Sequence, residues 1–257
     1  MKIGILGMGI GRVFAKVCQD LGYEVQVYDL IEEKCRGFIR NPNLEEECQK
    51  IIICLPDNLH YRVSKRLLEK RKDVLLVKPA TRSVKKLIRL YKLARQKNVV
   101  FKVALPQRFR KELPKKDWDG FMAWWQGSEE DVPKWRKKED VWWDLGIHLV
   151  DLFYFTGGKD FKDQVRFLFV SYVPKEECQL YVLWDNHGES VSGFRDGKLG
   201  KYNDEYTFRN CVLDWLETKE TSVDENYIKA METISKYKGR EKIFYERVLN
   251  PEFNRNL

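Results

Sequence analysis

The chain has 257 residues, of which 43% are hydrophobic and 13% aromatic, and its formal net charge is +8. This composition supports packed cores and excludes a disordered protein. No stretch approaches the roughly 20 apolar residues of a membrane helix. The first residues do not resemble a signal peptide. We therefore expect a cytoplasmic protein with no membrane partner, long enough for two modest domains.

The six cysteines are scattered along the chain and form no C-x-x-C pair. Several of them lie in apolar runs, where a free cysteine behaves as a small hydrophobic residue. We expect reduced, buried thiols. Three histidines offer little for a metal centre, so no metal site is predicted.

Basic residues are concentrated in residues 62–116, which hold 20 Lys and Arg against 3 Asp and Glu. The simplest interpretation is that amphipathic helices carry these charges on their solvated faces. Attraction of an anionic partner, such as an anionic sugar or a sugar nucleotide, is an alternative. Nucleic-acid binding is disfavoured, because the region holds three aromatic residues and no recognition motif.

The first 29 residues follow the order strand, glycine turn, helix, strand, acidic residue. Residues 2–6 are an apolar run that leads into Gly7, and apolar residues then recur at helical spacing. Residues 24–28 alternate as a strand, and Asp29 follows directly. This is the order that a dinucleotide-binding unit requires.

Each part of this unit has a physical role. Gly7 permits the tight turn, and Gly9 lets the backbone approach a pyrophosphate. The helix that begins near Gly11 directs its free N–H groups and positive dipole end at the phosphates. Asp29 is placed to accept hydrogen bonds from both ribose hydroxyls, and its charge favours NAD over NADP.

The glycine fingerprint is irregular. When G-x-G-x-x-G is counted from Gly7, the third glycine position is Arg12, and Gly11 lies one residue early. Either the turn is shortened or Arg12 replaces a small residue. We expect the whole turn, including Ile10, to contact the cofactor.

Strands alternate with helices up to residue 103. The expected elements are a strand at 51–55, a helix around 63–68, a strand at 74–77, a helix at about 83–97 and a strand at 99–103. The pattern predicts an α/β Rossmann domain with a doubly wound parallel sheet over residues 1–107.

The pattern changes after residue 106. Strand-like runs lie at 121–125, 165–173 and 179–184, and helices are expected around 144–156 and 204–217. This predicts an α+β domain over residues 108–257 with a mainly antiparallel sheet. Both faces of the last two strand runs are largely apolar. We therefore expect a homo-oligomer, in which a second copy covers the outer face of the sheet.

Four short motifs, in this order, resemble the glucose–fructose oxidoreductase/inositol dehydrogenase (Gfo/Idh/MocA) family. They are the N-terminal glycine turn, Leu55-Pro56-Asp57-Asn58-Leu59-His60, Val77-Lys78-Pro79-Ala80 and Asp144-Leu145-Gly146-Ile147-His148-Leu149-Val150-Asp151. The resemblance continues in a closing helix pair at 208–218 and 222–237, so it covers nearly the whole chain.

The resemblance implies that Lys78, Asp144 and His148 are the catalytic residues and meet at the nicotinamide. His148 would take a proton from a substrate hydroxyl as hydride leaves the same carbon. Lys78 would stabilise the developing alkoxide charge, and Asp144 would orient His148 or relay the proton. The expected cofactor contacts beyond the glycine turn and Asp29 are Leu55, Pro56, Asn58, His60, Lys78 and Gln107.

The implied activity is NAD(P)-dependent hydride transfer at a hydroxyl or carbonyl carbon of a sugar, cyclitol or nucleotide-linked sugar. A non-catalytic dinucleotide-binding or sensor protein is the alternative, which Val77 favours because it replaces the family's usual glutamate. Without the motif, His148 is typical of an interior histidine and Asp144 of a helix cap. Lys34 and Arg36 follow Asp29 closely and leave NADP as an alternative cofactor.

Overall fold

The computed structural model describes residues 1–128, 130, 141–173, 175–187, 189–197, 205–237 and 242–244. The chain forms two compact units. The first contains Met1–Phe109 and Asn203–Asp224, and the second contains Arg110–Tyr202 and Glu225–Leu257. The sequence predicted a single boundary between residues 107 and 108. That boundary does not account for the return of the chain to the first unit.

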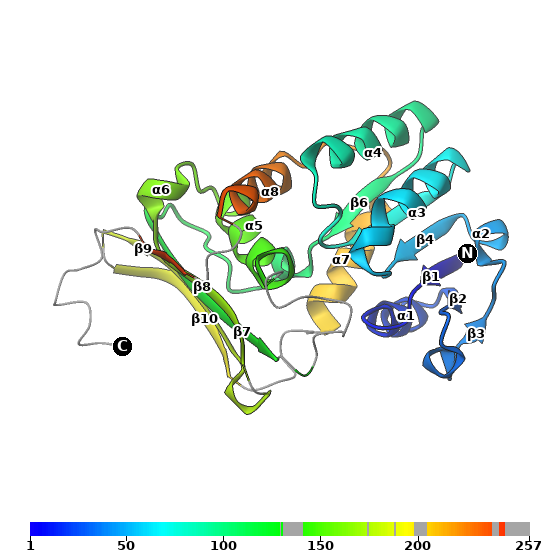
Figure 1. The fold of residues 1–257 in the computed structure, drawn as a ribbon, viewed down its shortest axis with the longest axis horizontal. Coiled ribbons are helices and arrows are strands. Elements are labelled where there is room, and N and C mark those ends of the chain that lie inside the picture. The colour runs from blue at the N-terminus through cyan, green and yellow to red at the C-terminus, as the bar shows by residue number, and fades with distance from the viewer. Residues whose placement is uncertain are drawn as a thin grey trace. The chain divides into compact units, whose positions relative to one another are not determined.

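A six-stranded parallel sheet forms the centre of the first unit (Figure 1). Its strands are β1 (Lys2–Leu6), β2 (Glu24–Tyr28), β3 (Ile39–Arg40), β4 (Lys50–Ile53), β5 (Asp73–Val77) and β6 (Phe101–Ala104). Their order is β3-β2-β1-β4-β5-β6, and every pair is parallel. The predicted doubly wound Rossmann sheet is therefore confirmed. The strand order reverses between β1 and β4, the position at which such sheets bind ligands.

Helices cover both faces of this sheet. They are α1 (Gly11–Asp20), α3 (Asp57–Glu69), α4 (Val84–Lys97) and α7 (Glu205–Glu217). Helix α1 packs against α7, while α3 packs against α4 on the opposite face (Figure 1). The rings of Phe14 and Phe208 meet edge to face, with centroids 5.0 Å apart, where α1 and α7 touch. The buried sheet residues between these helices supply the core.

The segment after α7 closes the edge strand β6. The hydroxyl of Thr221 accepts the N–H of Phe101 at 2.8 Å and donates to the carbonyl of Val99 at 2.7 Å. Arg108 forms two hydrogen bonds with the carboxylate of Asp224, at 2.8 and 3.1 Å. Because buried backbone groups need partners, these contacts fix the returning segment to the first unit.

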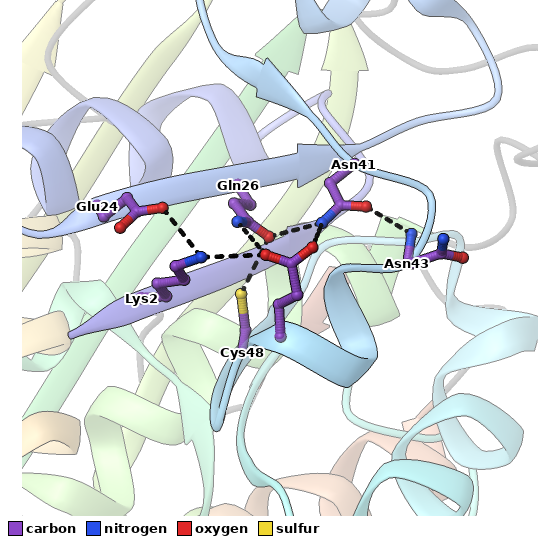
Figure 2. Close-up of polar contacts among 7 residues, drawn as sticks. Lys2, Glu24, Gln26, Asn41, Asn43 and Cys48 are labelled. Atoms are coloured by element: carbon purple, nitrogen blue, oxygen red, sulfur yellow. Dashed lines mark hydrogen bonds and ion pairs between the residues drawn. The ribbon is translucent and has the colours of Figure 1, made fainter.

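The connection from β2 to β4 is short and contains no long helix. Its elements are a 3-10 turn (Glu32–Cys35), β3 and the one-turn helix α2 (Leu44–Glu47). The carboxylate of Glu47 accepts hydrogen bonds from Gln26 at 2.9 Å, Lys2 at 3.0 Å and Asn41 at 2.9 Å (Figure 2). These bonds, led by that from Gln26, lower the pKa of Glu47 to about 2. A polar cluster thus holds a segment that has little apolar surface of its own.

A five-stranded sheet forms the second unit. Its strands are β7 (Gly120–Ser128), β8 (Val165–Val173), β9 (Gln179–Asn186), β10 (Glu189–Gly197) and β11 (Lys242–Phe244), in the order β10-β9-β7-β8-β11. The pair β7–β8 is parallel, and the other three pairs are antiparallel. The predicted mainly antiparallel sheet is confirmed, although β10 and β11 were not predicted.

The helical elements of the second unit include a buried helix that carries the candidate residues. They are a π-helical turn (Trp142–Gly146), α5 (Ile147–Phe155), α6 (Phe161–Gln164) and α8 (Glu225–Tyr237). Helix α5 lies against β7 and packs on α8 (Figure 1). Every residue from Ile147 to Phe153 is buried, as expected for a helix with packing partners on several sides. Within the described ranges, no helix has the length and apolarity to span a membrane.

Candidate functional site

The glycine turn joins β1 to α1 with four residues, 7–10. Gly7 has a φ of +88°, and a Cβ atom there would lie 2.5 Å from the backbone oxygen of Cys54. Its N–H donates to the carbonyl of Tyr28 at 2.8 Å. Only glycine fits, because this backbone conformation and this close approach both exclude a side chain.

Gly11 takes the place of the third glycine of the fingerprint. A Cβ atom there would lie 3.1 Å from Cγ2 of Ile5 and 3.3 Å from Cβ of Cys54, so α1 packs closely on the sheet. The Arg12 guanidinium instead donates to carbonyl oxygens of residues 34 and 36, at 3.1 and 2.9 Å. The turn is therefore shortened by one residue, and Arg12 does not replace a packed glycine.

The space beside Gly9 is open. A Cβ atom there would meet no atom within 4 Å. No side chain caps the start of α1 at Ile10, and the first turn of this helix holds no acidic residue. The positive end of α1 and the bare backbone of Gly9 together fit a pyrophosphate group.

Asp29 follows β2, and two backbone N–H groups hold its carboxylate. Met8 donates to Oδ2 at 2.7 Å, and Ile31 donates to Oδ1 at 2.9 Å. The first of these bonds ties the end of β2 to the glycine turn. Each carboxylate oxygen can accept a further hydrogen bond, so Asp29 is held in an orientation that fits ribose hydroxyls.

The remaining predicted cofactor residues lie at the same carboxyl edge of the sheet. They are Leu55, Pro56, Asn58 and His60 after β4, Lys78 after β5 and Gln107 after β6. Asn58 is exposed in the first turn of α3, and Lys78 is half-buried. Lys78 forms a cis peptide bond with Pro79. Gln107 is buried in a 3-10 turn (Pro106–Phe109).

The second unit holds Asp144 and His148. Asp144 lies in the π-helical turn, and the Tyr172 hydroxyl of β8 donates to its Oδ2 at 2.8 Å. His148 lies in the first turn of α5, is buried, and has its ring centroid 5.3 Å from that of Trp125. The described residues from Val141 onward are already helical, so Asp144 is inside a helical run and does not cap it.

Tyr172 and Trp125 are neighbours of these candidates that the sequence did not identify. Tyr172 lies 28 residues from Asp144, and Trp125 lies on another strand, so no local spacing relates them to the motif. The glycine of the motif has a packing role, because a Cβ atom on Gly146 would overlap the Trp142 ring. Glycine thus lets that ring pack against the backbone of the turn.

The cysteines are unsuited to nucleophilic chemistry. All six lie in the described ranges and are buried. Burial raises the pKa of Cys18 to about 12 and that of Cys48 to about 11, so these two thiols stay protonated at neutral pH. Among the residues that the structure describes, no group of three or more His, Cys, Asp and Glu could hold a metal ion.

Residues 1–105 match the sequence model of the GFO_IDH_MocA family, described as an oxidoreductase family with an NAD-binding Rossmann fold. Over these residues the chain is similar to the Rossmann domain of that family. The resemblance inferred from the motifs is confirmed, and NAD is the cofactor of this Rossmann type. No curated protein matches the chain.

Solved structures share the fold over nearly the whole chain. Myo-inositol 2-dehydrogenase from Lactobacillus plantarum has a TM-score of 0.74 at 12% identity, covering 91% of this chain and 95% of that one. UDP-N-acetylglucosamine 3-dehydrogenase from Acidithiobacillus ferrooxidans has a TM-score of 0.68 at 14% identity, covering 93% and 96%. The WlbA dehydrogenase from Thermus thermophilus, in complex with NAD and UDP-GlcNAcA, has a TM-score of 0.67 at 15% identity, covering 93% and 95%. At these identities the likeness establishes the two-domain fold alone.

Proposed function

We propose that this protein is an NAD-dependent dehydrogenase or reductase that acts on a hydroxyl or carbonyl carbon of a sugar, a cyclitol or a nucleotide-linked sugar. The observation that carries the proposal is the geometry at the carboxyl edge of the parallel sheet in the first unit, hereafter the cofactor edge. The open backbone at Gly9 and the oriented carboxylate of Asp29 fit the two parts of NAD that such folds recognise. The family match of residues 1–105 supports the same cofactor.

We propose Lys78, Asp144 and His148 as the catalytic residues. Bound NAD supplies the hydride acceptor or donor. In the oxidising direction, His148 accepts the proton of the substrate hydroxyl. Lys78 stabilises the negative charge on that oxygen. Asp144, whose orientation is set by the Tyr172 hydroxyl, keeps His148 in its working orientation or relays its proton.

The substrate class rests on the solved structures of the same fold. Those named above are dehydrogenases of an inositol and of UDP-N-acetylglucosamine, and one was solved with NAD and UDP-GlcNAcA. The excess of basic residues between 62 and 116 is compatible with an anionic sugar or a sugar nucleotide. We place the protein in the cytoplasm, where NAD and such substrates occur.

A non-catalytic dinucleotide sensor is the second candidate. Val77 supports it, because this residue replaces a glutamate that is usual beside the lysine in the family. Val77 is half-buried and packs against the apolar core of the first unit. The sensor would bind NADH but would transfer no hydride.

A substrate screen separates the two candidates. NAD reduction is followed at 340 nm with cyclitols, uronic acids and UDP-sugars, for the wild type and for Lys78→Met and His148→Asn. We expect turnover with one class of substrate. In His148→Asn, kcat should fall by roughly 10²–10⁴-fold, while NADH binding is retained. NADH binding without turnover on any class supports the sensor. If His148→Asn turns the substrate over as fast as the wild type, His148 is not the base.

We also propose a homodimer through the outer face of the second sheet. Trp124, Phe167, Phe169 and Tyr181 are half-buried and alternate with fully buried residues along their strands. The rings of Trp124 and Tyr181 stack with centroids 4.4 Å apart. A continuous aromatic surface of this kind is typical of an interface. Sedimentation should give a dimer at micromolar concentration, and a monomer would contradict this proposal.

A further inference from the structure

His60 joins two of the turns at the cofactor edge. It lies in the first turn of α3, and its side chain is 1% exposed. Its Nδ1 lies 2.8 Å from the carbonyl oxygen of Pro79, and its Nε2 lies 2.6 Å from the carbonyl oxygen of Leu55. One imidazole ring therefore bridges the turn after β4 and the turn after β5.

The two partners of this ring decide its protonation. A carbonyl oxygen can only accept a hydrogen bond, whereas a neutral imidazole carries one N–H and one acceptor nitrogen. If His60 were neutral, one contact would set a nitrogen lone pair against an oxygen lone pair at hydrogen-bond distance. The imidazolium form carries N–H on both nitrogens and satisfies both contacts.

Burial opposes this charge, because desolvation disfavours the ionised form of histidine. The charged residues on the two joined turns are Asp57, Lys78 and Arg82. Asp57 accepts a hydrogen bond from Arg82 at 2.7 Å and is itself 7% exposed. Its carboxylate, on the same helical turn as His60, offsets part of the cationic charge around the ring. Two charge-assisted hydrogen bonds to His60 then favour the imidazolium over a neutral ring that makes one.

We propose that His60 is a buried imidazolium and acts as a positioning residue for Lys78. Its bond to Pro79 holds the residue that follows Lys78, and its bond to Leu55 holds the neighbouring turn of the cofactor edge. Loss of the His60 proton removes one of these bonds and frees one turn relative to the other. The proposed charge state is independent of the enzyme's activity, whereas the positioning role rests on the proposed function.

The charge state can be measured directly by NMR of the ring nitrogens, because the protein has three histidines. Signals are assigned by exclusion with His148→Asn and His187→Gln, so the assignment survives if His60→Gln fails to fold. We expect both His60 nitrogens to keep the imidazolium shift at pH 7.5. His187, which is exposed, serves as the comparison for the buried ring in the same spectra. Two separated nitrogen signals for His60 at pH 7.5, typical of a neutral tautomer, would overturn the proposal.

The positioning role is tested with His60→Gln and with Ser64→Ala as a matched control. Ser64 is buried one turn further along α3, and its hydroxyl has no hydrogen bond within the described residues. We expect kcat to fall by roughly 100-fold in His60→Gln, with KM for NAD changed far less, because Lys78 is misplaced. Ser64→Ala should leave both unchanged. In the wild type, kcat should decline as pH rises through the His60 titration seen by NMR, and this step should be absent in His60→Gln.

A kcat equal to that of the wild type in folded His60→Gln would overturn the positioning role. If no substrate is turned over at all, the proposed function fails, while the NMR measurement still decides the charge of His60. The two failures are therefore distinguishable.

Discussion

Replacement of Gly7 by alanine tests how the glycine turn is built. At this position two independent effects oppose a side chain. The backbone has a φ of +88°, and the added Cβ atom would lie 2.5 Å from the oxygen and 2.8 Å from the carbon of the Cys54 backbone. These atoms belong to the chain at the end of β4 and cannot move aside as a flexible side chain would.

Gly22 separates the two effects. It has a φ of +82°, yet a Cβ atom there would meet nothing within 4 Å. The left-handed backbone costs an alanine about 1–2 kcal/mol, and the lower entropy of the unfolded chain offsets about 0.4–1 kcal/mol of this. The backbone cost and the entropy offset apply equally at Gly7 and at Gly22. Overpacking against fixed atoms adds roughly 1–3 kcal/mol at Gly7 alone.

We therefore expect Gly7→Ala to lower the free energy of unfolding by about 2–4 kcal/mol and Gly22→Ala to lower it by about 1 kcal/mol. The assay is chemical denaturation followed by circular dichroism, with wild type and both variants measured side by side. If Gly7→Ala loses no more stability than Gly22→Ala, the close approach of the turn to Cys54 does not govern this position.

Three further substitutions test the β6 edge, the Glu47 cluster and the Asp144 contact. Thr221→Val should lower the free energy of unfolding by about 2–4 kcal/mol, because it leaves one amide and one carbonyl of the β6 edge unpaired; a loss below 1 kcal/mol by denaturation would refute this. Glu47 has a lowered pKa of about 2, so its stabilising contribution is full above its unfolded value near 4.5 and is lost as pH falls toward 2. As pH falls, the melting temperature of the wild type should consequently drop more steeply than that of Glu47→Gln. An equal drop in the two proteins would contradict this contribution of Glu47. Tyr172→Phe should lower kcat by about tenfold with little change in stability, because Asp144 loses its hydroxyl donor; unchanged kcat would argue against this orienting role.

The Rossmann half was predictable because its signals are local. The segment from Gly7 to Asp29 contains a turn, a helix and a strand in fixed order, and the residues that determine each element lie within that segment. The third glycine position of the fingerprint was harder to interpret. Sequence alone left two interpretations of Arg12, and only the packing of Gly11 against Ile5 and Cys54 decides between them.

Long-range contacts were not predictable from one sequence. Thr221 pairs with β6 across 120 residues, and nothing near it in the chain indicates that partner. Tyr172 lies on a strand whose apolar pattern predicted β structure, but that pattern does not identify Asp144 as its contact. Strand β10 was missed because residues 189–197 are rich in polar residues and glycine, which are uncommon in strands. These features depend on tertiary structure rather than on local preference.

Calorimetric titration of NADH tests whether the open backbone at Gly9 receives the pyrophosphate of NAD. A Cβ atom on Gly9 meets no protein atom, so Gly9→Ala should unfold at the same temperature as the wild type. We expect NADH to bind the wild type and to bind Gly9→Ala roughly tenfold or more weakly. Equal affinity for both proteins, or a folded wild type that binds neither NADH nor NADPH, would contradict it.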